Sequence, residues 1–215
     1  MGLPSTEKDE VMLTDQTRQG ESILDPVALD VLFREARTAN TFTDEPVTDE
    51  QLRAFYDLLK WPPTSANTQP LRLLILRTAE AKARLVPLMT EGNRAKTATA
   101  PAVIIVAADI DFHEQIPRVF PIRPEFKDYF VDPAVREPFA RFNAALQTGY
   151  VILAIRAVGL AAGPMAGFDA AGVDQEFFAG TALKSILVIN IGKPGPDAWF
   201  PRLPRLDYED VITHL

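Results

Sequence analysis

The segment from Pro63 to Pro70 constrains this chain more than any other stretch of its sequence. Each proline fixes its own φ angle and restricts the residue before it, so the segment is stiff. Short polar side chains fill the space between the prolines: Thr64, Ser65, Asn67, Thr68 and Gln69. A helical pattern ends just before the segment, and an apolar strand pattern follows it. A rigid polar loop in this position suits a flat ligand with hydrogen-bonding groups along one edge, although a proline-rich turn that caps its neighbours has the same composition.

Composition and charge narrow the class of protein. The 215 residues are 47% hydrophobic and 24% charged, which is enough for one domain with a substantial core. A net charge of −7 without a basic stripe speaks against a nucleic-acid partner. No apolar run reaches the length of a membrane span, so we expect no membrane partner. We expect a flexible arm over residues 1–24 and a single domain over residues 25–215.

The lack of cysteine limits the chemistry that the side chains offer. It excludes disulfides, a thiol nucleophile and a thiolate metal site, and it fits a reducing compartment such as the cytoplasm. His113 and His214 have no companions at metal-ligand spacing, so we expect no metal. No nucleophile elbow, Walker A loop or dinucleotide-binding glycine motif is present. If this chain is an enzyme, a bound cofactor supplies the hard chemistry.

Capping residues and hydrophobic spacing predict the first helices. Residues 25–37 begin with an Asp-Pro start signal and form a predicted helix with Val27 and Val31 facing inward. Thr48 and Gln51 form a capping box for a second helix. The predicted buried stripe of that helix is Leu52, Phe55, Tyr56 and Leu59.

Strands and an irregular stretch follow. We predict a strand over 71–77, a helix from Thr78 to about Pro87, and a fully buried strand over 101–108. Residues 110–131 mix aromatic, proline and basic residues without a period. Such a stretch is typical of a lid or a binding loop, and its aromatic content argues against disorder.

The longest predicted helix begins at Asp132-Pro133 and ends at Gly163-Pro164. It is apolar on more than one face, which indicates burial within the domain or against a second subunit. We also predict a short helix over 174–178, a strand over 183–191 and a C-terminal element capped by Asp207. Together these elements favour an α+β layered fold with a mostly antiparallel or mixed central sheet flanked by helices.

The proline-bounded loop resembles the P-S-S-x-N-x-Q-P loop of the nitroreductase family, whose members are flavin mononucleotide (FMN) enzymes. The matching residues are Pro63, Thr64, Ser65, Asn67, Gln69 and Pro70. In the family this loop runs beside the isoalloxazine ring and the ribityl chain. The pyrimidine end of the ring offers alternating carbonyl and N–H groups, which suit Ser, Asn and backbone partners.

Residues 36–40 resemble the basic segment with which the family contacts the phosphate and the ribityl chain. The candidate contacts are Arg37, Thr38 and Asn40. Asn40 replaces a second basic residue of the family pattern. Asn93 and Lys96 have the spacing of the Asn and Lys that the family places near the pyrimidine end. A Lys there stabilises the negative charge that reduction puts near N1 and O2.

Residues 163–168 resemble the family's turn whose backbone N–H lies near flavin N5, the atom that takes and gives hydride. The candidate contacts are Pro164, Met165, Ala166 and Gly167. Gly167 permits close approach of the backbone, and Ala166 stands where other members often carry Glu. Arg202 matches the Arg of the family's R-L-P segment, which binds the FMN phosphate, and Arg205 is a second candidate.

Several runs are most similar to the malonic semialdehyde reductase (3-hydroxypropionate dehydrogenase) branch of bacterial pyrimidine degradation: 36–40, 60–67, 163–169, 177–185, 190–192 and 202–206. The resemblance implies an oxidoreductase that passes hydride from NAD(P)H through flavin N5 to a small acceptor such as malonic semialdehyde, without a catalytic side chain. A reductase of nitroaromatics or quinones is an alternative, and a non-catalytic flavin-binding protein is another.

The resemblance also implies an acceptor site and an assembly. Arg118, Phe120 and Arg123 in the aromatic stretch are candidates for contacting the acceptor, with an Arg holding its carboxylate. The family places the flavin at a subunit interface with the long helices packed across it, so we expect a homodimer. Small residues in the 133–162 helix independently favour close packing.

Overall fold

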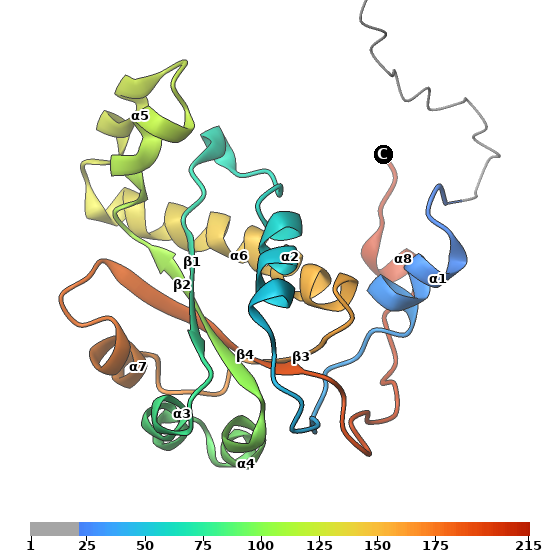
Figure 1. Ribbon diagram of the computed structural model, residues 1–215. Coiled ribbons are helices and arrows are strands. Elements are labelled where there is room, and N and C mark those ends of the chain that lie inside the picture. Colours follow the sequence, from blue (N-terminus) through green and yellow to red (C-terminus); the bar gives the residue numbers. More distant parts are fainter. Residues whose placement is uncertain (1–21) are drawn as a thin grey trace, which may run out of the picture.

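A four-stranded sheet in the order β1-β2-β4-β3 forms the centre of the computed structural model, which describes residues 22–215 (Figure 1). Its strands are β1 (Leu71–Leu76), β2 (Ala102–Asp109), β3 (Ala161–Met165) and β4 (Leu183–Gly192). Every neighbouring pair is antiparallel, so the predicted α+β fold is confirmed. The predicted arm over 1–24 lies almost wholly outside the described residues.

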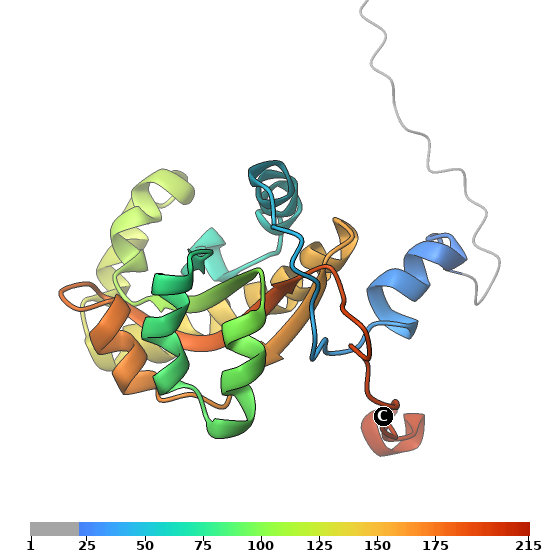
Figure 2. The same ribbon diagram turned by 60° about the horizontal axis from the view of Figure 1, so that its bottom comes forward.

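Helices cover both faces of this sheet (Figure 2). On one face lie α2 (Asp49–Leu59) and α6 (Pro133–Ala157), and on the other lie α3 (Ala79–Leu85), α4 (Glu91–Thr99) and α7 (Ala170–Phe177). The central strand β2 contributes to both cores. Ile104 and Val106 pack beneath α6, whereas Val103 and Ile105 pack on the opposite side. Their complete burial agrees with the strand predicted over 101–108.

Side-chain caps begin the helices where the sequence predicted. Thr48 and Gln51 form the capping box of α2, and Asp132 caps α6. Phe55 of α2 is buried as expected. Tyr56 is 59% exposed, which corrects its place in the predicted buried stripe. The helical spacing was right, but Tyr56 lies at the margin of the stripe, where no element within residues 22–215 covers it.

The first helix stands apart from the layered body. α1 (Pro26–Leu29) is capped by Asp25 as predicted, and it continues as a π-helical turn only to Arg34. Val27 and Val31 are exposed, which corrects the prediction that they face inward. Figures 1 and 2 show that α1 projects away from the sheet, and none of its residues is buried by the described part of the chain.

Strand β3 replaces the predicted end of the long helix. α6 ends at Ala157, and Gly159 follows with a φ of 76°. Gly163 and Pro164 therefore lie in a strand and do not end a helix. Proline is tolerated at this point because β3 is an edge strand that pairs only with β4.

The irregular aromatic stretch folds as short helical turns. These are a 3-10 turn over Phe112–Gln115, α5 (Ile116–Val119) and a 3-10 turn over Pro124–Phe130. The buried rings of Phe112 and Phe130 lie 4.9 Å apart between centroids. Phe130 also packs on Phe139 of α6 at 4.6 Å. The stretch is ordered, as its aromatic content indicated.

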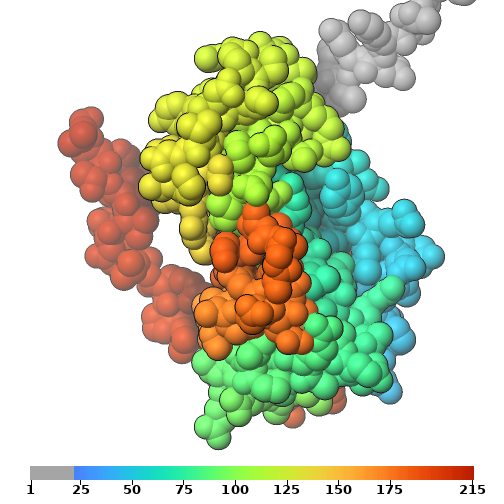
Figure 3. All heavy atoms as spheres, turned by 90° about the vertical axis from the view of Figure 1, so that its left-hand side faces the viewer, coloured from blue at the N-terminus to red at the C-terminus, as the bar shows by residue number. Residues whose placement is uncertain are grey.

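The C-terminal segment leaves the body after β4. It ends with α8 (Tyr208–Val211), which Asp207 caps as predicted. All residues from Trp199 onward are exposed in the single chain, including the apolar Leu203 and Leu206. Figure 3 shows this red segment projecting from one side of the molecule.

Candidate functional site

The residues predicted to contact the phosphate come together at the β3 edge of the sheet. Residues 36–40 run along this edge, where the Ala39 N–H donates to the carbonyl oxygen of Ala162 at 3.0 Å. The Asn40 N–H donates to the carbonyl oxygen of Ala198 at 3.0 Å. A cavity of about 450 Å³, here called the arginine cavity, is lined by Ala36, Arg37, Thr38, Asn40, Phe200, Pro201, Arg202, Leu203 and Arg205.

The guanidinium groups of Arg37, Arg202 and Arg205 give this cavity positive charge. Arg202 donates through Nη2 to the carbonyl oxygen of Arg34, which joins the two distant ends of the chain. Arg37 pairs with Glu35 at 3.3 Å, and its buried Nε has no hydrogen-bond partner among residues 22–215. Clustered arginines with unused N–H groups are suited to a phosphate.

Asn93 and Lys96 of α4 lie at the same edge. Lys96 Nζ is 3.5 Å from Oδ1 of Asn40. Asn93 Nδ2 donates to the carbonyl oxygen of Gly167 at 3.0 Å, and the Thr90 hydroxyl donates to the same oxygen at 3.0 Å. The structure thus brings together the predicted segments 36–40, 93–96, 164–167 and 202–205.

Two glycines at this edge are required by close packing. A Cβ on Gly163 would lie 2.6 Å from the carbonyl oxygen of Ala39. A Cβ on Gly167 would lie 2.6 Å from Oγ1 of Thr90. Ala166, between them, is exposed, so the turn presents backbone and a methyl group to a ligand.

Buried polar groups lie beneath this turn. The Met165 side chain points into the core, with Sδ 3.9 Å from Nδ2 of Asn190 and 3.9 Å from Oγ1 of Thr97. Oδ1 of Asn190 is buried and has no partner among the described residues. A cofactor at this turn therefore meets the backbone of Met165 and not its side chain. Asn190 was not predicted as a site residue, because a single polar residue in a buried strand carries no ligand signal of its own.

The proline-bounded loop lies at the opposite edge, directly before β1. The Asp109 N–H donates to the carbonyl oxygen of Pro70 at 2.8 Å, at the end of β2 that is remote from α4. Ser65 and Asn67 are exposed. Positive φ angles occur at three non-glycine residues of the loop: Ala66 (50°), Asn67 (52°) and Gln69 (44°).

Two amides of α6 anchor this loop, and sequence reasoning missed both. Oδ1 of Asn143 accepts from the Ser65 N–H at 2.8 Å, and Oε1 of Gln147 accepts from the Leu71 N–H at 3.0 Å. Both amides are buried. Polar residues at i and i+4 on a helix face that is otherwise apolar are the signal that identifies such anchors.

A second cavity of about 580 Å³, here called the cationic cavity, lies beside this loop between α2, β1 and α5. Lys60, Arg72 and Arg118 line it, and no Asp or Glu does. Arg72 pairs with Asp109 at 2.6 Å. No ion pair involving Arg118 is found within residues 22–215, so its charge is available to a ligand.

The predicted acceptor residues lie in different surroundings. Arg118 faces the cationic cavity. Arg123 instead lies 3.6 Å from Glu125 and over the ring of Phe126. Phe120 packs edge to face against the same ring. The structure therefore keeps Phe120 and Arg123 together around Phe126 and places Arg118 apart from them, in the cationic cavity.

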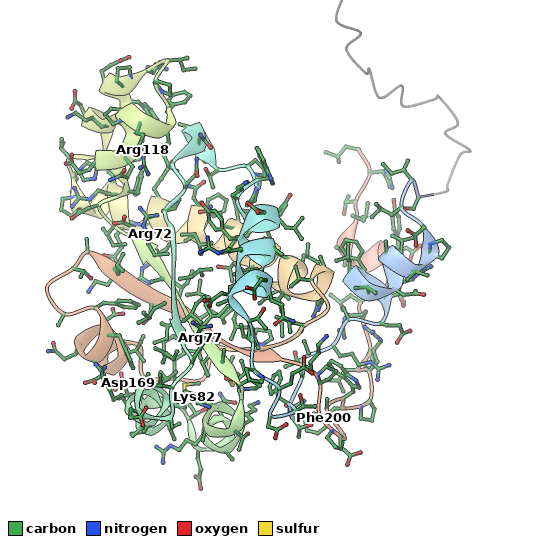
Figure 4. The ribbon with its side chains drawn as sticks, viewed as in Figure 1. Arg72, Arg77, Lys82, Arg118, Asp169 and Phe200 are labelled. Carbon is green, nitrogen blue, oxygen red and sulfur yellow. The ribbon has the colours of Figure 1, made fainter. Side chains whose placement is uncertain are left out.

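The two groups of predicted cofactor residues do not meet within one chain. The arginine cavity lies at the β3 edge and the loop at the β1 edge of the sheet. With neighbouring strands about 4.8 Å apart, three spacings separate these edges by roughly 14 Å. In Figure 4, Arg118 of the cationic cavity and Phe200 of the arginine cavity lie at opposite corners of the molecule.

Residues 22–215 contain no group of three or more His, Asp or Glu side chains placed to hold a metal ion. Over the same range, no helix has the length and hydropathy needed to cross a bilayer.

Comparison with known proteins identifies the family. The model of the nitroreductase family matches residues 33–193, which is most of the chain. The protein belongs to the nitroreductase family. It is therefore an enzyme, an oxidoreductase of the class that uses FMN as cofactor and NAD(P)H as reductant.

Individual relatives agree with this assignment. A protein of Streptomyces griseus with the provisional name NADH dehydrogenase/NAD(P)H nitroreductase is 59% identical over 192 residues, covering 89% of this chain and 97% of the relative. A Streptomyces coelicolor protein with the same provisional name is 58% identical over 192 residues, again covering 89% and 97%. The relatives carry nitroreductase names, and none of these names specifies malonic semialdehyde.

A solved structure shows the same fold. It comes from Exiguobacterium sibiricum and is described as a nitroreductase in complex with FMN. It matches with a TM-score of 0.78 at 20% identity, covering 91% of this chain and 99% of that chain.

The donor groups at the β3 edge fit FMN. The arginine cavity offers several guanidinium groups, one of them with an unpartnered buried Nε, to a phosphate. Within the described residues, Lys96 makes one hydrogen bond, of 3.5 Å to Asn40, so its charge is available to a ligand. Gly167 lets Thr90 and Asn93 pack closely against the turn that is predicted to lie near N5.

Proposed function

We propose that this enzyme works as a homodimer whose composite site reduces a small, negatively charged acceptor. One observation carries the proposal: the predicted cofactor segments lie at two opposite edges of the sheet. The Pro63–Pro70 loop lies at the β1 edge, and the other segments lie at the β3 edge, namely 36–40, 93–96, 164–167 and 202–205. Arg37, Arg202 and Arg205 would hold the phosphate, and Lys96 would lie near the pyrimidine end. Bound FMN supplies hydride acceptance and donation.

The separated half-sites support the dimer. The loop and the 36–40 segment are both expected beside the ribityl chain, yet they occupy opposite edges of one chain. A second copy that places its loop against the arginine cavity resolves this conflict. Three apolar side chains on α6, spaced four residues apart, are exposed: Phe142 (62%), Leu146 (45%) and Tyr150 (43%). This exposed apolar stripe suits a second copy.

Leu146→Glu tests the dimer. A charge on the stripe should give a monomer by light scattering and should also remove FMN binding, because each site needs both copies. Ala83→Glu on α3 is the matched control, since Ala83 is exposed on the other face of the sheet. A wild-type monomer that retains FMN would contradict the composite site.

For the acceptor we propose a short aldehyde acid such as malonic semialdehyde, reduced to 3-hydroxypropionate. The cationic cavity beside the loop, without a lining carboxylate, suits a carboxylate-bearing molecule. Arg118 would bind that carboxylate and so orient the carbonyl carbon. Arg118→Ala should raise KM, whereas Arg123→Ala should leave it unchanged because Arg123 lies outside the cavity. An unchanged KM in both variants would remove this assignment.

A nitroarene or quinone is the second candidate acceptor, and the names of the relatives favour it. The exposed ring of Tyr129 beside Phe126 offers a surface on which a flat molecule can stack. Comparison of kcat/KM for a short aldehyde acid and a nitroarene separates the two candidates. The larger value identifies the class of acceptor.

The purified protein should be yellow, and heat should release FMN and not FAD. NADH or NADPH should bleach the bound flavin without oxygen, which separates an enzyme from a protein that only stores flavin. We also propose that the enzyme works in the cytoplasm, because it needs NAD(P)H as reductant. A colourless protein that takes up no FMN in excess would contradict the whole proposal.

A further inference from the structure

We propose that Asn143 is a positioning residue that sets where the Ser65 hydroxyl lies in the flavin site. This inference rests on the proposed function, because it takes the loop as a flavin contact. Asn143 is fully buried on α6. Its Oδ1 accepts from the Ser65 N–H at 2.8 Å, and its Nδ2 donates to the carbonyl oxygen of Phe139 at 3.0 Å. The bond to Phe139 fixes the amide so that its oxygen faces the loop.

The backbone conformation of the loop requires a stabilising contact such as the hydrogen bond from Ser65 to Asn143. Ala66, Asn67 and Gln69 occupy the left-handed region, which costs a non-glycine residue on the order of 1–3 kcal/mol. Conformations of this kind persist only where the surroundings fix them. The bond from α6 reaches the loop at Ser65, immediately before the first of these residues.

Three other polar side chains of the loop are already engaged, and Oγ1 of Thr68 is buried without a partner among residues 22–215. Nδ2 of Asn67 donates to the carbonyl oxygen of Val119 at 2.7 Å, and its Oδ1 accepts from Nε2 of Gln69 at 2.9 Å. Oγ1 of Thr64 accepts from the Gln69 N–H at 3.2 Å. Ser65 is exposed, and its hydroxyl makes no hydrogen bond within residues 22–215. Ser65 is therefore the exposed, unbonded hydroxyl that this loop offers to a ligand, whereas the Thr68 hydroxyl is buried, and Asn143 determines the place of Ser65.

Asn143→Leu removes both side-chain bonds at similar volume. The Ser65 N–H is then unsatisfied, so we expect the Kd for FMN to rise roughly tenfold to a hundredfold. Thr148→Val is the matched control on the same helix. The buried Thr148 hydroxyl donates only to the carbonyl oxygen of Ala144 at 2.7 Å, so its loss should leave the Kd within about twofold.

Asn143→Asp provides a readout that a general packing role would not change. The protonated acid can accept from Ser65 and donate to Phe139, whereas the ionised acid has no proton to donate. Burial raises the pKa of such a carboxyl. The ratio of the variant Kd to the wild-type Kd should approach one at about pH 5.5 and should rise by about pH 8.5. Taking the ratio cancels the titration of the FMN phosphate.

The outcomes separate this inference from the proposed function. A wild-type protein that binds no FMN contradicts both the positioning role and the proposed function. If the wild type binds FMN and folded Asn143→Leu binds it equally tightly, the positioning role is overturned and the proposed function stands. If Asn143→Leu does not fold, Asn143→Asp provides the test. A ratio of its Kd to the wild-type Kd that does not change with pH overturns the positioning role of Asn143.

Discussion

Gly167→Ala tests the packing that holds Asn93 beside the predicted flavin turn. The added Cβ would lie 2.6 Å from Oγ1 of Thr90 and 2.9 Å from Nδ2 of Asn93. Thr90 is stiff at χ1 because it is β-branched, and its hydroxyl is bonded to the Gly167 carbonyl oxygen. Asn93 is bonded to the same oxygen. Relief of the clash must therefore displace at least one of these side chains.

The cost follows from these contacts. Overpacking costs about 1–3 kcal/mol, and the loss of a neutral hydrogen bond adds about 1 kcal/mol. We expect the free energy of unfolding to fall by about 2–4 kcal/mol, which lowers the melting temperature by roughly 4–15 °C in a chain of this length. Displacement of Asn93 should also raise the Kd for FMN about tenfold, the equivalent of one hydrogen bond.

Thermal unfolding of the FMN-free protein and fluorescence titration with FMN measure the two effects separately. Gly92→Ala on α4 is the matched control, because no atom lies within 4 Å of its added Cβ. Gly92 is the second residue of α4, so alanine there should stabilise the protein by at most about 0.5–1 kcal/mol. Adding Thr90→Ala to Gly167→Ala removes the closest contact, so the double variant should lose less than the sum of the single losses. Wild-type stability and FMN affinity in Gly167→Ala would refute the reasoning.

Three further predictions address the charge at the site and the helix caps. Lys96→Met should lower the midpoint potential of bound flavin by about 20–40 mV in a spectroelectrochemical titration, since it removes about 1–2 kcal/mol of stabilisation from the reduced form; an unchanged potential would place Lys96 away from the ring. Thr48→Ala should cost about 1 kcal/mol in urea unfolding, because the capping box with Gln51 is lost; equal stability would mean that water replaces the cap. Hydrogen bonds from its own backbone N–H and from Thr78 lower the pKa of Glu80 in the folded protein below the ordinary value of 4.5. The ionised Glu80 therefore stabilises the fold above pH 4.5, and this stabilisation is lost as the pH falls through the lower pKa of the folded state. The difference in melting temperature between wild type and Glu80→Gln should accordingly vanish in acid, and a constant difference would contradict this account.

Local signals predicted most of the fold. The capping box at Thr48 and the β-branched run of β2 each determine their own conformation, and both were predicted correctly. Strand β3 was missed because Ala161–Met165 is short, contains Gly and Pro, and continues an apolar run that also fits a helix. Its strand conformation comes from pairing with β4, which no local pattern encodes.

The candidate site shows the same limit. Motifs predicted which segments contact the cofactor, because a residue pattern such as that of the Pro63–Pro70 loop is local, and this assignment stays a prediction. Sequence did not show that this loop lies at the β1 edge while Arg202 lies near β3, since that separation depends on strand order. Asn143 and Gln147 were missed because their role exists only once α6 packs under the loop.

The contact between Arg202 and Arg34 has a consequence for how the protein is made. The two residues are 168 positions apart, and each belongs to an end of the chain. At about 5–20 residues per second, a ribosome delivers Arg202 some 8–34 s after Arg34. If the arginine cavity binds the phosphate as proposed, a nascent chain has no complete phosphate pocket before Arg202 is made, so loading with FMN would follow that step.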